Sequence, residues 1–248
     1  MRQKGYLAHE LAYRKMERDG IAAWNERLGG PAIDRDLLRF LRDAFAQPYM
    51  PREGRALEIG CGTAPILRWV AARGFRATGI DASPTAIRMA KRQSRGVRGI
   101  DLRVGDATHL RGVADGSIDV VVDGNCLHCI VGDRDREAVQ REIARVLRPG
   151  GCFVVLSMAR PLRSSRRIGE RPGFVRENVM FQPIDGAQAV RGAVRVDGVW
   201  YAPTRRFEHW RAMLRMLERH GLEPRLVRLA LASADEPLSH LAAVAVRS

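Results

Sequence analysis

The sequence predicts an α/β fold in which helices cover both faces of a mostly parallel sheet. From residue 55 onward, short apolar runs alternate with amphipathic segments of helical length. The apolar runs are continuous instead of alternating with polar residues, which is typical of strands buried on both faces. The chain has 248 residues, of which 46% are hydrophobic, so it is long enough to bury one large core.

Residues 1–53 are expected to form a helical N-terminal cover, separate from the domain at residues 54–248. Apolar residues recur at helical spacing after Pro31. Asp34 and Asp36 follow this proline, and the dipole of a helix favours acidic side chains in its first turn. A helix is therefore expected to begin there.

Strands and helices are expected to alternate over the next hundred residues. The five expected strands are Ala56–Ile59, Phe75–Ile80, Ile100–Val104, Ile118–Val122 and Cys152–Met158. The helices between them are expected at residues 66–73, 84–95 and 133–147. Ser83 and Pro84 give the second of these helices an N-cap and a first-turn proline, so its start is the best defined.

The last part of the chain departs from this alternation. A helix is expected over Phe207–His220, followed by two strands, Leu226–Leu231 and Leu241–Val246. A turn at Pro237 would join the two strands, which are close enough in sequence to pair in antiparallel fashion. Residues 159–206, which precede the helix, form an insertion rich in glycine, proline and arginine.

The charge and the cysteine content narrow the class of protein. The formal net charge is +14, but the basic residues are almost all arginines spread along the whole chain, which favours a composition bias over a nucleic-acid surface. No apolar run has the length of a membrane span, and the charged start does not suit a signal peptide. Four cysteines are too few for a disulfide scaffold, so a cytoplasmic protein that crosses no membrane is expected.

Three expected strands end in residues that suit an adenosyl ligand. The first strand runs into Gly60 and Gly62, whose backbone N–H groups a ligand can approach closely. Asp81 ends the second strand, where a carboxylate can accept both hydroxyls of a ribose, and Asp106 follows the third, where it can accept the amine of adenine. Ligands of open parallel sheets bind beyond this end of the strands.

At these positions the chain resembles the class I S-adenosylmethionine-dependent methyltransferases. The resemblance covers roughly residues 55–158 and the C-terminal helix and strand pair. The matching motifs are Glu58–Thr63, Gly79–Ser83, Gly105–Ala107, Ser117–Val121, Leu127–His128 and Leu147–Gly151. The resemblance implies a Rossmann-like three-layer sandwich with a seven-stranded sheet, an antiparallel last strand, and S-adenosyl-L-methionine as cofactor, released as S-adenosyl-L-homocysteine.

The same resemblance implies the cofactor contacts. The methionine moiety would lie against the glycine loop, the ribose on Asp81, and the adenine against Asp106 and Ala107. The full expected set is Glu58, Gly60, Cys61, Gly62, Asp81, Ala82, Asp106, Ala107 and Asp123. The third glycine of the family's loop is Ala64 here. A dinucleotide is excluded, because Pro65 and Ile66 follow Ala64 and the last glycine of the dinucleotide motif is missing, and the loop also lacks the lysine of a nucleoside triphosphate site.

Two residues after the fourth strand are candidates for catalysis. His128 is the candidate general base, because an imidazole suits proton removal near neutral pH. The alternative is that it only packs beneath the cofactor. Asp123 would contact the methionine amine or the substrate, or would simply hold the turn before Gly124. Cys126, His128 and Cys129 match no standard zinc spacing, so no metal is expected.

The expected function is methyl transfer to an oxygen, sulfur or nitrogen of a small molecule by a monomer or homodimer. Amino-group methyltransferases of this fold carry prolines and an aromatic residue where Asp123–His128 stand here, so amide and exocyclic amine acceptors are disfavoured. The N-terminal helices and the 159–206 insertion would cover the substrate, or their aromatic side chains would only attach them to the core. Two alternatives remain open: an RNA- or protein-directed methyltransferase that uses the arginine-rich surface, and a cofactor-binding module without catalysis.

Overall fold

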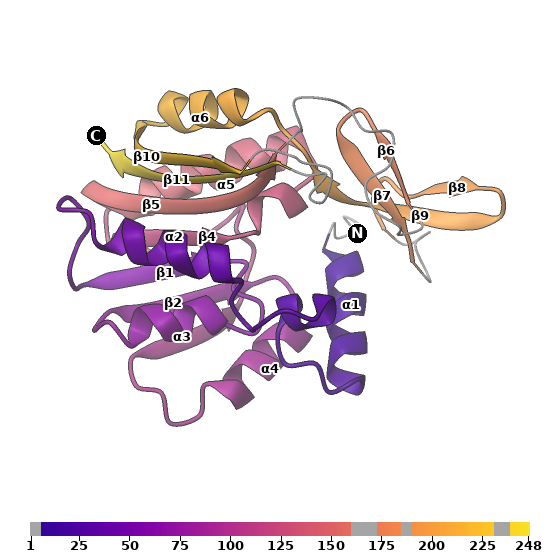
Figure 1. The fold of residues 1–248 in the computed structure, drawn as a ribbon, viewed down its shortest axis with the longest axis horizontal. Coiled ribbons are helices and arrows are strands. Elements are labelled where there is room, and N and C mark those ends of the chain that lie inside the picture. The colour runs from indigo at the N-terminus through magenta and orange to yellow at the C-terminus, as the bar shows by residue number, and fades with distance from the viewer. Residues whose placement is uncertain (1–5, 160–172, 185–189, 231–238) are drawn as a thin grey trace.

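The computed structural model describes residues 6–159, 173–184, 190–230 and 239–248, and its centre is a seven-stranded sheet in the order β10-β11-β5-β4-β1-β2-β3 (Figure 1). These strands are β1 (Arg55–Ile59), β2 (Arg76–Asp81), β3 (Ile100–Val104), β4 (Ile118–Gly124), β5 (Leu147–Ala159), β10 (Leu222–Ala230) and β11 (Ser239–Arg247). In this sheet β11 pairs antiparallel with both of its neighbours, and the first five strands pair parallel. The mostly parallel sheet with an antiparallel last strand is therefore confirmed.

Helices cover the sheet on both faces, as the continuous apolar strands predict. The helices of the sandwich are α2 (Arg35–Phe45), α3 (Pro65–Ala71), α4 (Pro84–Gln93), α5 (Asp133–Val146) and α6 (Trp210–Arg219). Successive strand residues point to opposite faces: Ala56 packs with α2, α3 and α4, whereas Leu57 packs with α5 and α6. The result is a three-layer sandwich with two apolar cores.

Several element boundaries differ from the expected ones. β5 begins at Leu147 instead of Cys152, because Leu147 already pairs with Ile118 of β4 before a bulge in the ladder. α6 begins at Trp210 instead of Phe207, because the Phe207 side chain is buried in the core and the imidazole of His209 caps the helix by accepting from the Arg211 amide. The expected N-cap at Ser83 is confirmed, since its hydroxyl oxygen accepts from the Ala86 amide.

The insertion contains a second sheet that the sequence analysis did not predict. Its four antiparallel strands have the order β6-β7-β9-β8. They are β6 (Phe174–Arg176), β7 (Val179–Pro183), β8 (Val194–Val196) and β9 (Val199–Arg206). The arginine-rich part of the insertion includes a basic run, Arg163, Arg166, Arg167 and Arg171. This run and the turn expected at Pro237 lie outside the described residues.

The N-terminal segment does not act as one unit. α2 is part of the sandwich, because Leu41 and its apolar neighbours pack into the core beside the sheet. By contrast, α1 (Leu7–Arg18) lies between α4 and the insertion, next to the short 3-10 helix η1 (Trp24–Leu28) (Figure 1). The separation of residues 1–53 as a cover stays a prediction, and within that segment α1 and η1 are the elements that lie outside the three layers.

Candidate active site

The glycine loop after β1 has the backbone conformation that its sequence requires. Gly60 and Gly62 both have positive φ angles, +60° and +53°, where a Cβ is unfavourable. A side chain at Gly60 would collide with the Cys126 thiol, and one at Gly62 would collide with the Tyr13 hydroxyl. The loop is therefore tightly enclosed, by the segment after β4 and by α1.

Ala64 also adopts a left-handed conformation, with φ +60° and ψ +37°, at the N-cap of α3. This conformation costs an alanine about 1 kcal/mol, because its Cβ approaches the following carbonyl oxygen. We therefore expect Ala64→Gly to raise the free energy of unfolding by about 1 kcal/mol. Urea denaturation measures the change, with Ala90→Gly inside α4 as the control that should lower stability by a similar amount. A less stable Ala64→Gly protein would show that packing of this buried methyl group outweighs the backbone strain.

Asp81 joins the glycine loop to the start of α4. Its Oδ2 accepts from the Gly62 amide at 2.9 Å, and its Oδ1 accepts from the Ser83 amide at 2.8 Å. Burial raises the pKa of this carboxyl group. Each carboxylate oxygen has a further lone pair, so both can still accept from the hydroxyls of a ribose.

Glu10 of α1 is a buried carboxylate that the sequence analysis missed. It accepts from the Ser83 hydroxyl at 2.6 Å, and from the hydroxyl and the amide of Thr85 at 2.8 and 3.3 Å. Burial alone would raise its pKa, but the hydrogen bonds from Ser83, Arg14 and Thr85 hold the pKa of Glu10 below its ordinary value. The contact fixes α1 beside the Asp81 turn.

Tyr13 lies one helical turn after Glu10. Its contact with the glycine loop is the second contact of α1 that the sequence did not predict. The centroids of the Tyr13 and Trp24 rings are 5.3 Å apart, and both side chains pack with α4. Tyr13 and Trp24 were expected either to cover the substrate or to attach extra helices to the core. The structure shows the attachment, and it also places the Tyr13 hydroxyl over Gly62.

Two buried polar atoms beside the loop have no hydrogen-bond partner among the described residues. They are Oε2 of Glu58 and Oγ1 of Thr63. Burial raises the pKa of Glu58 well above its ordinary value. Unpaired buried groups are uncommon in folded proteins, and here both belong to the loop motif, so they suit a polar ligand such as the methionine end of the expected cofactor.

The remaining expected cofactor residues are arranged in different ways. Asp106 is exposed at the rim, where its Oδ1 accepts from the amide and hydroxyl of Thr108, and Ala107 is half-buried behind it. Ala82 lies in the turn after Asp81. Cys61 points into the core and its amide donates to the Ile80 carbonyl, so neither group faces outward from the loop. The assignment of these residues to the cofactor stays a prediction.

Asp123 has a structural role in the turn after β4. It is fully buried, its Oδ1 accepts from the Cys126 amide at 2.6 Å, and its Oδ2 accepts from the Leu127 amide at 2.9 Å. These bonds shape the 3-10 turn η2 (Leu127–Cys129). The turn-forming alternative therefore describes the observed contacts of Asp123.

Burial raises the pKa of Asp123 to about 7 from an ordinary value of 3.8. A group whose pKa is raised in the folded state stabilises that state below its unfolded pKa, and the contribution is lost as pH rises through the folded value. We therefore expect the stability of the wild-type protein, relative to Asp123→Asn, to fall between about pH 4 and pH 7. Urea denaturation at a series of pH values tests this. A constant difference across the range would show that Asp123 is ionised throughout.

His128 is buried, and one of its ring nitrogens accepts a backbone hydrogen bond. It is 2% exposed, and its Nδ1 accepts from the Met158 amide at 3.3 Å. Burial lowers the pKa of His128 well below 6.5, so the ring is neutral and carries its proton on Nε2. The expected general base thus has no free lone pair in this arrangement. The packing alternative fits better.

The comparisons with known proteins agree with the fold and with the motifs of this site. The fold, a three-layer sandwich with the glycine loop and Asp81 at the carboxyl ends of its strands, is that of a Rossmann-like methyltransferase. Residues 57–155 match a family model described as "Methyltransferase domain". Residues 57–155 therefore form a methyltransferase domain, in a chain with the fold of the class I S-adenosylmethionine-dependent methyltransferases.

Two curated relatives and one solved structure illustrate the similarity. A 2-heptyl-1-hydroxyquinolin-4(1H)-one methyltransferase of Mycobacteroides abscessus is 35% identical over 105 residues, 42% of this chain and 45% of that protein. A human thiol S-methyltransferase is 35% identical over 100 residues, 39% of each chain. The chain thus spans less than half the length of these two relatives.

The structural neighbour is similar over nearly its whole length. It is the Burkholderia thailandensis 1,6-didemethyltoxoflavin-N1-methyltransferase, solved with 1,6-didemethyltoxoflavin and S-adenosylhomocysteine bound. The TM-score is 0.64 at 17% identity, and the match covers 98% of this chain and 89% of that one. At this level of identity the likeness shows the fold.

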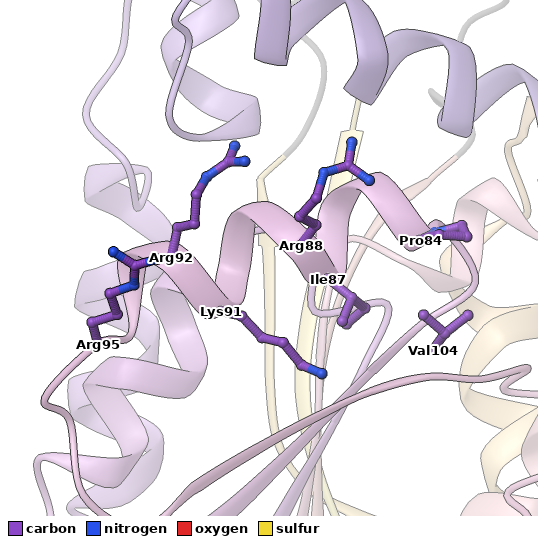
Figure 2. A pocket seen from close by; sticks show the side chains of 7 residues that line it. All are labelled: Pro84, Ile87, Arg88, Lys91, Arg92, Arg95 and Val104. Carbon is purple, nitrogen blue, oxygen red and sulfur yellow. The ribbon is translucent and has the colours of Figure 1, made fainter.

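A basic hollow of about 370 Å³ lies outside this site, along α4 and beside the end of β3 (Figure 2). Four of its lining residues are Arg88, Lys91, Arg92 and Arg95. Arg88 and Arg92 share one carboxylate, Glu17 of α1, which offsets one of the four positive charges. The alternative of a nucleic-acid substrate stays untested by this hollow.

Two searches of the described residues were negative. In the parts of the chain that the structure describes, no three histidine, cysteine or acidic side chains are grouped in a way that could hold a metal ion. Within the same parts, the helices are too short or too polar to cross a membrane. The absence of a metal and the cytoplasmic location both stay predictions.

Proposed function

We propose that this protein transfers the methyl group of S-adenosylmethionine to an oxygen, sulfur or nitrogen of a small-molecule acceptor. The observation that carries the proposal is the pair of hydrogen bonds from the Gly62 and Ser83 amides to Asp81, which joins the loop and the turn where the cofactor would be held. Asp81 would bind the ribose, the glycine loop the methionine moiety, and Asp106 and Ala107 the adenine.

The cofactor supplies an already activated methyl group when it is bound. The protein's own part is therefore to position the acceptor and to exclude water. α1 and the insertion sheet, which pack against each other through Ala8 and Ala202, enclose the loop side of the site and suit this task. Methylation by a monomer or homodimer in the cytoplasm remains part of the proposal.

The acceptor is proposed to ionise before transfer. His128 has its Nδ1 occupied, and the thiols of Cys126 and Cys129 have pKa values raised by burial, so these groups do not suit proton removal. An acceptor with an acidic O–H or S–H group needs no strong base. The names of the two curated relatives, an N-hydroxyquinolone methyltransferase and a thiol methyltransferase, agree with such acceptors.

Calorimetry and a transfer assay test the proposal together. The purified protein is expected to bind S-adenosylhomocysteine with micromolar affinity, and to transfer a labelled methyl group to 1-hydroxyquinolin-4(1H)-one or to thiophenol. Mass spectrometry identifies the methylated atom. A protein that binds no S-adenosylhomocysteine would contradict the proposal, and binding without transfer to any tested O–H, S–H or N–H acceptor would favour the cofactor-binding module.

A further inference from the structure

Arg205 of β9, in the insertion sheet, is a buried cation. The residue is 9% exposed. Its Nη1 donates to Oε1 of Gln182 at 3.1 Å, and its Nε is buried with no hydrogen-bond partner among the described residues. The same Gln182 oxygen also accepts from the Thr204 hydroxyl at 3.0 Å, so Arg205 shares a single neutral acceptor.

Two other buried or half-buried arginines have more acceptors than Arg205. Arg206, the next residue along β9, pairs with both Asp133 and Glu208. Arg136 is 3% exposed, and its guanidinium donates to the backbone carbonyl groups of Leu127 and Ile130. In the described parts of the chain, no carboxylate forms an ion pair with Arg205. A buried charge without a counter-ion is unfavourable, and proteins retain one where a ligand supplies the partner.

Arg205 lies on a strand of the insertion sheet that packs against the turn after β4. β9 packs against η2, the turn that carries His128 and Cys129. Burial is the largest cause that lowers the pKa of His9 to about 4, and the positive charge of Arg205 is the second largest. The same two causes, in the same order, lower the pKa of His128. Among the described residues, the side chains whose pKa Arg205 lowers are thus the imidazoles of His9 and His128 and the thiol of Cys129, which are neutral.

The position of Arg205 relative to the glycine loop follows from the same contacts. η2 comes directly after Cys126, whose thiol lies against Gly60. Arg205 therefore lies beyond the loop, on the side of η2 and the insertion. This is where an acceptor would approach a methyl group held near the loop.

We propose that Arg205 is a specificity-determining residue that binds a negatively charged group of the methyl acceptor, so that the substrates are small organic anions. The inference rests on the proposed function, because it assumes that this side of the loop is the acceptor site. A guanidinium binds a carboxylate through two parallel hydrogen bonds, and it also stabilises an ionised phenol, N-hydroxyl or thiol. The shared chemistry of these acceptors is one anionic oxygen or sulfur.

The first experiment compares stability in the absence of ligand. Arg205→Met is expected to be at least as stable as the wild type in urea denaturation, because it removes a cation that has no partner. Arg136→Met is the matched control and is expected to be clearly less stable, because it leaves two buried carbonyl groups unpaired. Equal losses in the two variants would overturn the proposal by showing that Arg205 already has a structural partner.

The second experiment compares ligands in the presence of S-adenosylhomocysteine. Benzoate is expected to raise the melting temperature of the wild type, and benzamide, which is neutral and similar in shape, is expected to raise it less. Arg205→Met should abolish this difference and lower kcat/KM for thiophenolate or 1-hydroxyquinolin-4(1H)-one about 10- to 100-fold. Arg205→Lys keeps the positive charge, so it should retain part of the difference between benzoate and benzamide and part of the kcat/KM. Benzoate tests whether Arg205 binds a carboxylate of the acceptor. Thiophenolate and 1-hydroxyquinolin-4(1H)-one test whether it binds the ionised nucleophile itself.

Two outcomes separate this inference from the proposed function. If S-adenosylhomocysteine binds and methyl transfer occurs, but benzoate and benzamide behave alike and Arg205→Met leaves kcat/KM unchanged, then the role of Arg205 is wrong and the methyltransferase assignment stands. If S-adenosylhomocysteine does not bind the wild type, the proposed function itself fails. The affinity for S-adenosylhomocysteine is expected to be the same in wild type and Arg205→Met.

Discussion

Asp81→Ala is expected to weaken the binding of S-adenosylmethionine and S-adenosylhomocysteine about 10- to 100-fold, the effect of losing hydrogen bonds to a charged group. Two losses add up in this variant. The carboxylate no longer accepts from the ribose hydroxyls, and the amides of Gly62 and Ser83 lose the acceptor that holds the loop and the turn together. Isothermal titration calorimetry with S-adenosylhomocysteine measures the effect directly.

Asp101→Ala is the control for this variant. Asp101 lies on β3, is exposed, and pairs with Arg103, so its removal should leave the affinity unchanged. Asp81→Asn separates the two losses, because an amide oxygen can still accept from one backbone amide but carries no charge. An affinity of Asp81→Ala equal to that of the wild type would show that the ribose is bound elsewhere.

Glu10→Ala is expected to cause the largest loss of stability among these variants, about 3 kcal/mol. The Ser83 hydroxyl and the hydroxyl and amide of Thr85 donate to this carboxylate, and all would lose their acceptor in a buried position. Because Tyr13 of the same helix lies over Gly62, the affinity for S-adenosylhomocysteine should fall as well. Urea denaturation and calorimetry on one preparation give both results.

Glu17→Ala, about two turns further along α1, is the matched control. Glu17 pairs with Arg88 and Arg92 at the surface, where such ion pairs contribute about 0–1 kcal/mol. The depressed pKa of Glu10 adds a pH signature. Its stabilising effect is present above its ordinary pKa of 4.5 and is lost as pH falls through the lower folded value, so wild type and Glu10→Gln should converge in acid. Equal losses in Glu10→Ala and Glu17→Ala would show that the buried contact is unimportant.

Sequence reasoning predicted those parts of the site that directly follow an apolar strand of the parallel sheet. Gly60, Gly62 and Asp81 follow directly after apolar strands, and a parallel sheet brings the ends of such strands to one edge. The same reasoning placed Asp123 at this edge, but it could not show that both of its oxygens accept from backbone amides of the next turn.

The residues that sequence reasoning missed depend on contacts between distant segments. Glu10 and Tyr13 lie in a helix with many polar residues, and nothing local indicates that Ser83 and Gly62 lie opposite them. Arg205 is one arginine among many, and its proposed role rests on an Nε atom that has no hydrogen-bond partner in the described parts of the chain. One signal was available for the insertion sheet: Asp197-Gly198 between valines is typical of a two-residue hairpin turn, and both residues have positive φ.

α1 touches two parts of the molecule with different tasks. Leu7 and Ala8 pack against the insertion sheet, whereas Glu10 and Tyr13 contact the segments around the cofactor loop. A single helix therefore links the proposed acceptor site to the proposed cofactor site. Thermodynamic reciprocity then requires that any factor by which a ligand on one side of this helix changes the affinity for a ligand on the other side is the same in both directions.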